Sequence, residues 1–151
     1  MLNTFLPLLR AAEGVDLSSP SAAIAELTRR FDPKGKPARE LNAALGQLLA
    51  TGKIAERGEE PVKFGRVAKV GPDTHGFSID VVHMSGPGLE HRHPNGEVNY
   101  CIALDGAPRF DGHPAGWVVF PPESQHVPTV AGGTMLIVYL LPGGAIEFKK
   151  A

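Results

Sequence analysis

Three histidines and one glutamate in the second half of the chain have the residue types and the spacing of a metal site. His91 and His93 are separated by one residue, so on an extended strand both imidazoles point to the same side. Glu97 follows a Pro-Asn-Gly turn that can bring its carboxylate back toward these rings. His126 comes after a short apolar segment that ends in two prolines. The spacing therefore predicts three nitrogens and one oxygen around a single point.

Such a donor set fits a catalytic transition metal. Imidazole and carboxylate are ligands for first-row divalent ions. Four protein ligands on an octahedral ion leave two positions for water or substrate, which a catalytic site requires. Because no thiolate is present, a structural zinc site is disfavoured. We expect one divalent metal, with Fe, Mn, Ni, Co, Cu and Zn all open. A His-X-His pair alone also fits two surface histidines, and the added glutamate and third histidine favour ligation.

Short apolar segments separated by turns must position these residues. Glycine and proline number 18 and 14 among 151 residues, well above the usual combined share of about 12%. Most of them lie after residue 70, in segments such as SGPG, DGHPAG and VAGG. Short strands at this spacing predict an antiparallel sandwich or barrel. The candidate strands are residues 62–70, 76–84, 96–104, 116–120 and 134–141.

The first part of the chain is expected to be helical. Apolar residues recur at helical spacing over residues 2–9 and again over 37–52, and a serine before Pro20 resembles a helix start. We expect about three short helices here. The net charge is +3 over residues 1–70 and −4 over residues 71–151, which marks a boundary in the same place as the glycine and proline excess. The predicted organisation is a helical segment over residues 1–60 packed on a β-barrel over residues 61–151.

Cysteine content and hydropathy bear on the compartment. A single cysteine, Cys101, excludes an intrachain disulfide and fits a reducing environment. The first residues do not resemble a signal peptide, and no apolar stretch approaches the roughly 18–20 residues that span a bilayer. We expect a cytoplasmic protein without a membrane partner.

The motifs HRHPNGE and GWVVFPPESQH resemble the two-motif signature of the cupin superfamily. Gly88 and Gly106 flank the first motif, and Gly116 begins the second. The sequence departs from that signature at Glu123, which replaces the glycine of Pro-x-Gly. The resemblance covers about residues 62–148. It implies a mainly β fold, an antiparallel, jelly-roll-like cupin β-barrel with a metal in its mouth, and it assigns His91, His93, Glu97 and His126 as ligands.

The whole layout resembles a narrower family, the bacterial 4-hydroxylaminobenzoate lyases. The shared features are a helical segment of about 60 residues before one cupin barrel and HRHPNGEVNY at its centre. This resemblance implies a metal-dependent lyase that converts 4-hydroxylaminobenzoate, a small aromatic substrate, into 3,4-dihydroxybenzoate and ammonia. In that reaction the metal is expected to act as a Lewis acid or to activate water.

Several other residues are candidates for roles in the site. Between residues 71 and 148 the only cations besides histidine are Arg92 and Arg109. Arg92 alternates with the ligands, so Arg109 is the expected anchor for a substrate carboxylate. Each candidate also fits a structural or solvated role. The remaining candidates are Asn99 and Trp117 for substrate binding, and Glu97, His83 and Tyr139 for catalysis.

Two other functions compete with the lyase. A cupin dioxygenase would use the same metal site, and dependence on oxygen would distinguish it. Residues 19–67 also resemble a winged helix, which would indicate a ligand-sensing DNA-binding regulator. However, the segment 37–51 carries only Arg39 as a cation, balanced by Glu40, whereas DNA binding requires several basic side chains. A nucleic-acid partner is therefore not expected. The helices should instead cover the barrel or join the interface of a homodimer.

Overall fold

The N-terminal segment consists of three helices, as the sequence predicts. The computed structural model describes residues 1–149. The helices are α1 (Leu2–Ala12), α2 (Pro20–Arg30) and α3 (Lys36–Ala50). Proline stands at the start of α2 and in the first turn of α3, where its missing N–H costs no hydrogen bond. Within residues 1–149, no helix is both long and apolar enough to cross a bilayer.

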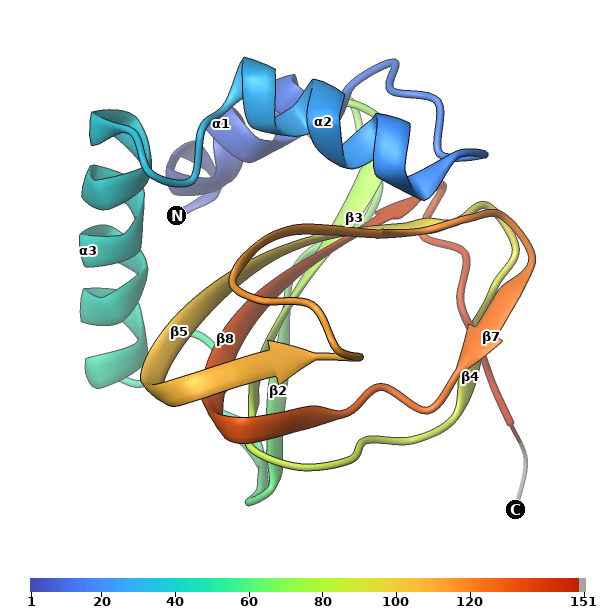
Figure 1. Cartoon of the computed structure of the whole chain (residues 1–151). Coiled ribbons are helices and arrows are strands. Elements are labelled where there is room, and N and C mark those ends of the chain that lie inside the picture. Colours follow the sequence, from blue (N-terminus) through green and yellow to red (C-terminus); the bar gives the residue numbers. More distant parts are fainter. Residues whose placement is uncertain (150–151) are drawn as a thin grey trace.

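The rest of the chain is antiparallel β structure, which confirms the mainly β, jelly-roll-like cupin fold (Figure 1). A six-stranded sheet has the order β1-β2-β3-β8-β5-β6, and a three-stranded sheet has the order β7-β4-β9. The two sheets are not joined into one closed barrel among the described residues. The strands are β1 (Arg57–Glu59), β2 (Val62–Ala68), β3 (Phe77–Met84), β4 (His91–His93), β5 (Glu97–Phe110), β6 (Gly116–Phe120), β7 (Ser124–His126), β8 (Val130–Pro142) and β9 (Glu147–Phe148).

The two faces of the large sheet bury different sets of side chains. On β8, Leu136, Val138 and Leu140 join the cluster packed against the helices. Met135, Ile137 and Tyr139 alternate with them and belong to a second cluster on the opposite face. This alternation follows from the two-residue repeat of a strand. One face of the sheet is therefore covered by helices, and the other faces the interior between the two sheets.

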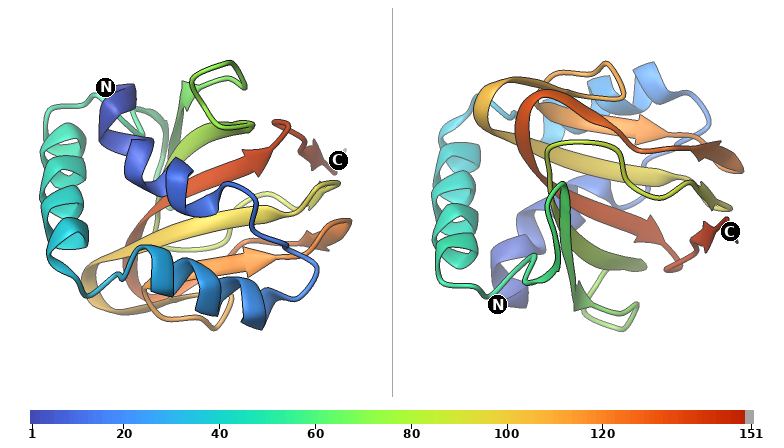
Figure 2. Two further views of the ribbon diagram at one scale, coloured as in Figure 1. Left: turned by 90° about the horizontal axis from the view of Figure 1, so that it is seen from above. Right: turned by 90° about the horizontal axis from the view of Figure 1, so that it is seen from below.

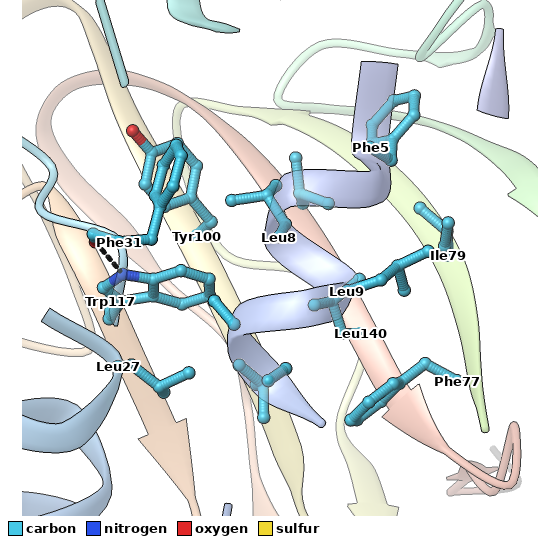
Figure 3. Packing of buried hydrophobic residues seen from close by; sticks show 14 of the residues in the cluster. Phe5, Leu8, Leu9, Leu27, Phe31, Phe77, Ile79, Tyr100, Trp117 and Leu140 are labelled. Atoms are coloured by element: carbon cyan, nitrogen blue, oxygen red, sulfur yellow. Dashed lines mark hydrogen bonds between the residues drawn. The ribbon is translucent and has the colours of Figure 1, made fainter. Parts of the chain in front are cut away.

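Helix α1 crosses the outer face of the large sheet, and α2 lies along β6 (Figure 2). Phe5, Leu8 and Leu9 of α1 are fully buried in the cluster that includes Ile79 and Leu140 (Figure 3). The helices and the sheet thus share one hydrophobic core. They cover one face of the β structure.

The segment that resembles the wing of a winged helix has a different place. β2 pairs with β3 along its length, with Phe64 opposite Val82 and Arg66 opposite Asp80. Although β1 and β2 form a hairpin after α3, β2 pairs on its other side with β3 and is an integral strand of the large sheet. The winged-helix interpretation of this segment is wrong, because its hydrogen bonds complete the cupin sheet.

Candidate metal centre

His91 and His93 come from β4, and His126 comes from the adjacent strand β7. The register places His91 directly opposite His126. The two histidines of β4 share one face and are 2% and 0% exposed. Arg92 between them points away and pairs with Glu147, as the alternation along the strand requires. Strand pairing alone therefore brings three imidazoles together.

Glu97 reaches the same point from the first residue of β5. Between β4 and β5 the chain turns at Gly96, whose φ is +86° and whose N–H donates to the carbonyl of His93 at 3.1 Å. A Cβ at this position would lie 3.0 Å from the backbone oxygen of Phe120, so glycine also satisfies a close approach. Glu97 Oε2 lies 2.8 Å from His93 Nε2 and 3.2 Å from His91 Nε2.

The turn before β7 keeps the geometry of the cupin signature despite its altered sequence. Glu123, which replaces the usual glycine, has a φ of +66°, in the left-handed region that favours glycine. Its N–H donates to the carbonyl of His93 at 2.8 Å, and its carboxylate lies 3.5 Å from Arg92 Nη2. The departure from the motif is therefore accommodated by the backbone, and His126 still faces the other ligands.

The outer nitrogen of each histidine is held by a hydrogen-bond acceptor. His91 Nδ1–H donates to the carbonyl of Leu89 at 3.2 Å, and His126 Nδ1–H donates to a carboxylate oxygen of Asp111 at 2.5 Å. Ser124 donates its hydroxyl proton to the carbonyl of Pro121, so it accepts from His93 Nδ1 at 2.8 Å. A neutral imidazole protonated at Nδ1 carries its lone pair on Nε2. All three lone pairs therefore point to the centre of the cluster.

These donors fit a divalent cation. The ligand atoms of His91, His93, Glu97 and His126 all lie within 4.8 Å of one another. His91 Nε2 and His126 Nε2 are 3.0 Å apart, which sets two acceptors against each other when both rings are neutral. Glu97 is fully buried, and its Oε1 has no hydrogen-bond partner. A cation between these atoms would satisfy all of them, since buried polar groups require partners.

The ionisation of Glu97 agrees with this role. Burial by itself raises the pKa of a carboxyl group, but hydrogen bonds and positive charge from His91 and His93, which require a proton on the inner Nε2 atoms, outweigh it and lower the pKa of Glu97 to about 2. A metal cation bound by the lone pairs of those atoms would favour the carboxylate in the same way. Glu97 is therefore a carboxylate at neutral pH, the form that binds a metal.

An apolar cavity of about 560 Å³ lies beside the cluster and includes His91 in its wall. This volume is in the range of small-molecule sites. Tyr139 lines the cavity, and Asn99 is buried on the same inner face of the sheet as Glu97. The Asn99 amide donates to the carbonyl of Val118 at 3.4 Å, while its Oδ1 has no partner. Both residues therefore stay candidates for the site.

Three residues predicted for the site lie elsewhere, outside the cavity wall formed by the described residues. Trp117 packs on the helix-covered face, where its Nε1–H donates to the carbonyl of Phe31 at 2.9 Å (Figure 3). His83 alternates with the inward Val82 and Met84, and its Nδ1 lies 3.7 Å from Glu60. Arg109 is exposed and donates to the carbonyl of Gly112 at 3.1 Å. The structure therefore does not bring these three residues to the cavity.

Sequence reasoning missed two residues that contact the clustered histidines and two that line the cavity. Asp111 accepts a hydrogen bond from His126, and Ser124 accepts one from His93. Sequence spacing does not predict either contact, because both depend on tertiary structure. Arg66 and Asp80 line the cavity and pair with each other, Nε to Oδ1 at 3.0 Å. Arg66 lies before residue 71, outside the segment in which Arg92 and Arg109 are the only arginines. Arg66 lies in the predicted strand 62–70, which belongs to the same sheet as β5 and β8. That strand is the sequence feature from which Arg66 could have been found.

The fold and the site together define a class of protein. Antiparallel β structure of jelly-roll type, with three histidines and a glutamate converging inside it, is that of a cupin whose cluster could hold a metal ion. The sequence model of the family described as PnbB, 4-hydroxylaminobenzoate lyase, matches residues 11–148. The match covers most of the chain and includes the four clustered residues. The chain therefore belongs to the 4-hydroxylaminobenzoate lyase family.

Two curated relatives are both named 4-hydroxylaminobenzoate lyase. The protein from Pseudomonas putida is 35% identical over 92 residues, covering 50% of this chain and 52% of the relative. The protein from Nocardioides sp. (strain LMS-CY) is 32% identical over 91 residues, covering 55% and 54%. The chain thus spans about half the length of the curated relatives it matches.

Similar solved structures include an RmlC-like cupin protein from Ralstonia eutropha, with 16% identity over 61% of this chain and 62% of that one and a TM-score of 0.44. Salicylate 1,2-dioxygenase from Pseudoaminobacter salicylatoxidans, in an adduct with gentisate, has 14% identity over 76% and 35% and a TM-score of 0.40. The family assignment rests on the sequence match.

Removing a ligand should remove the metal. His91→Ala and His126→Ala each delete one nitrogen from the cluster, so we expect both purified variants to lose most of the metal that the wild-type protein binds. His113→Ala, at an exposed histidine, is the matched control and should bind metal normally. Elemental analysis after dialysis measures the outcome. Full metal content in both ligand variants would refute this ligand set.

Asp111 should affect metal affinity through His126, without being a ligand itself. Asp111→Asn weakens the acceptor for His126 Nδ1–H, and losing such a support typically reduces metal affinity about 10-fold to 100-fold. Asp105→Asn is the control, because Asp105 Oδ1 also accepts a backbone N–H, from Thr134 at 3.0 Å, but holds no histidine. Competition with a chelator gives both affinities. Equal affinities in the two variants would show that Asp111 does not support the site.

Proposed function

We propose that the protein is a metal-dependent lyase that converts 4-hydroxylaminobenzoate into 3,4-dihydroxybenzoate and ammonia. The observation that carries the proposal is the family match over residues 11–148, which contains all four clustered residues. The names of the curated relatives and an apolar cavity beside the cluster support it. A flat aromatic ring suits walls built from side chains such as Val82, Met84 and Phe148.

The proposed reaction balances with one molecule of water. The N–O bond, the ring C–N bond and one ring C–H bond break, and two ring C–O bonds form. The nitrogen leaves as ammonia, which takes up the proton released from the ring carbon. The nitrogen is reduced while the ring is oxidised, so the hydroxylamine is its own oxidant. No external oxidant or reductant is needed, and oxygen should not be consumed.

His91, His93, Glu97 and His126 would hold one divalent transition metal, for which Fe, Mn, Ni, Co, Cu and Zn are the candidates. When bound, such an ion supplies Lewis acidity, which polarises a coordinated oxygen and lowers the pKa of a bound water molecule. The chain's contribution is to keep the four donor atoms converged and dry, since three of these residues are buried and His126 is largely so.

Tyr139 is the residue we propose as proton donor. It lines the cavity together with His91, on the inner face of β8. Burial raises the pKa of Tyr139 well above its ordinary value, and the nearby charge of Glu97 raises it further. The phenol therefore keeps its proton at neutral pH and can donate it to the hydroxyl oxygen that leaves the substrate nitrogen. The apolar cavity wall would keep bulk water from competing for that proton.

Replacing Tyr139 should slow turnover without releasing the metal. General acid catalysis contributes typically 10²-fold to 10⁴-fold, so we expect Tyr139→Phe to lower kcat at least about 100-fold. Tyr100→Phe is the matched control: Tyr100 lies on the helix-covered face and donates to Asn42 at 3.0 Å. Steady-state kinetics and metal content measure both variants. Equal kcat values in the two variants would exclude this role for Tyr139.

Turnover under nitrogen tests the function itself. Protein stripped with a chelator and reloaded separately with each candidate metal is incubated with 4-hydroxylaminobenzoate, and ammonia and 3,4-dihydroxybenzoate are measured. We expect equal amounts of both products without oxygen, no turnover before reloading, and no turnover by His126→Ala. Inactivity of every reloaded protein would refute the lyase. Turnover that requires air would support the dioxygenase instead.

A further inference from the structure

A row of polar side chains crosses the inner face of the large sheet. Strand registers place Arg66 opposite Asp80, Asp80 opposite Tyr139, and Tyr139 opposite Asn99. The row therefore runs from β2 through β3 and β8 to β5. Arg66 is thus at one end of the row. Asn99 is at the other end, two residues from Glu97 and therefore beside the candidate metal cluster. Neighbours on these strands, such as Val82 and Ile137, are apolar.

Arg66 lies exposed at the outer end of this row, and Asp80 orients its side chain. Its Nε and one terminal nitrogen donate to the two carboxylate oxygens of Asp80, at 3.0 and 3.3 Å. This two-point contact fixes the plane of the guanidinium, and Asp80 raises the pKa of Arg66 further. A guanidinium has five N–H donors, and among residues 1–149 only Asp80 is hydrogen-bonded to it. The remaining donors are free to bind a ligand, and Arg66 lines the cavity.

We propose that Arg66 binds the carboxylate of the substrate and thereby selects aromatic acids over neutral aromatic compounds. The identity of the acid rests on the proposed function, whereas the selection of a carboxylate rests on Arg66 alone. Among the described residues that line the cavity, Arg66 is the sole lysine or arginine. A planar guanidinium matches a carboxylate through two parallel hydrogen bonds, which a lysine cannot form.

The positions of Arg66 and His91 in the cavity suit a para-substituted acid. Arg66 belongs to β2 of the large sheet, whereas His91 belongs to β4 of the small sheet, and both line the same apolar cavity. A benzoate has its carboxylate and its 4-substituent at opposite ends of a rigid ring. Anchoring the carboxylate at Arg66 leaves the ring on the apolar wall and directs the 4-substituent toward the metal cluster.

Recognition at Arg66 depends on close hydrogen bonds more than on a positive field. Glu59 and Asp80 also line the cavity, so its wall is not positively charged overall. Asp80 offsets the charge of Arg66 at a distance, yet it leaves the free N–H donors in place. The site should therefore distinguish a carboxylate from a carboxamide of the same shape, because the amide offers only one acceptor oxygen and an NH₂ group that faces the donors.

Binding of benzoate and benzamide to the metal-loaded protein tests this proposal without any turnover. Isothermal titration calorimetry should show that the wild-type protein binds benzoate at least about tenfold more tightly than benzamide, because hydrogen bonds to charged groups typically give a tenfold to 100-fold effect. Arg66→Gln should abolish that preference and leave the affinity for benzamide within about threefold. Arg109→Gln, at the exposed arginine outside the cavity, is the control and should keep the preference.

A double variant controls for misfolding of the single variant. Arg66→Gln leaves the charge of Asp80 without its partner, whereas Arg66→Gln with Asp80→Asn leaves a neutral pair of similar shape. We expect the double variant to retain its metal and to lack the benzoate preference. Persistence of the preference in either variant would overturn the proposal, and this is the result expected if the benzoate carboxylate binds the metal itself. Loss of the preference in Arg109→Gln would overturn it too.

The same measurements separate this proposal from the proposed reaction. If the wild-type protein prefers benzoate, and loses that preference with Arg66, the carboxylate anchor stands even where 4-hydroxylaminobenzoate is not turned over. If turnover occurs but the wild-type protein does not prefer benzoate to benzamide, the lyase stands and the anchor is refuted.

Discussion

Convergence of four unprotonated ligand atoms on one buried point is the constraint on which the structure depends. Bringing Glu97 and three imidazole lone pairs together in a dry interior is unfavourable unless a cation satisfies them. The chain meets this requirement with backbone geometry: the β4–β7 register, the turn at Gly96, and the left-handed Glu123. Acceptors on the outer nitrogens then fix each ring. The candidate metal centre is therefore a property of strand register as much as of the four residues themselves.

The helices serve the same site indirectly. A sheet whose inner face carries Glu97, Asn99 and Tyr139 still has an apolar outer face, with residues such as Val98, Leu136 and Leu140. The small sheet faces the inner side, and α1 and α2 cover the outer side. Burial of large apolar side chains against the helices stabilises the sheet by hydrophobic contact. The inner face can therefore hold polar groups that contribute less to stability.

Much of this arrangement could be predicted from sequence, because motifs and the alternation of side chains along a strand (their parity) are local properties. The pairing of His91 with His93, the same face for Asn99 and Glu97, and the three helices all follow from spacing. Parity alone does not say which face of a strand is inward, however, because that depends on pairing with other strands. His83 and Trp117 fall on the wrong face for this reason, and Asp111 contacts His126 only after β5 and β7 are both in place.

Arg66 shows where a sequence argument about charge reaches its limit. The positive half and the negative half of the chain differ in composition, and a cation sought in the negative half is confined to Arg92 and Arg109. In the fold, however, β2 joins the large sheet beside β3. Arg66, from the positive half, therefore lies in the same row of polar side chains as Asn99 of β5, the strand that carries Glu97. Strand order thus brings Arg66 and one of the four clustered residues, His91, to one cavity although they lie far apart in the sequence. The proposed substrate, with a carboxylate at one end and a reacting group at the other, would use this combination, and neither half of the chain contains it alone.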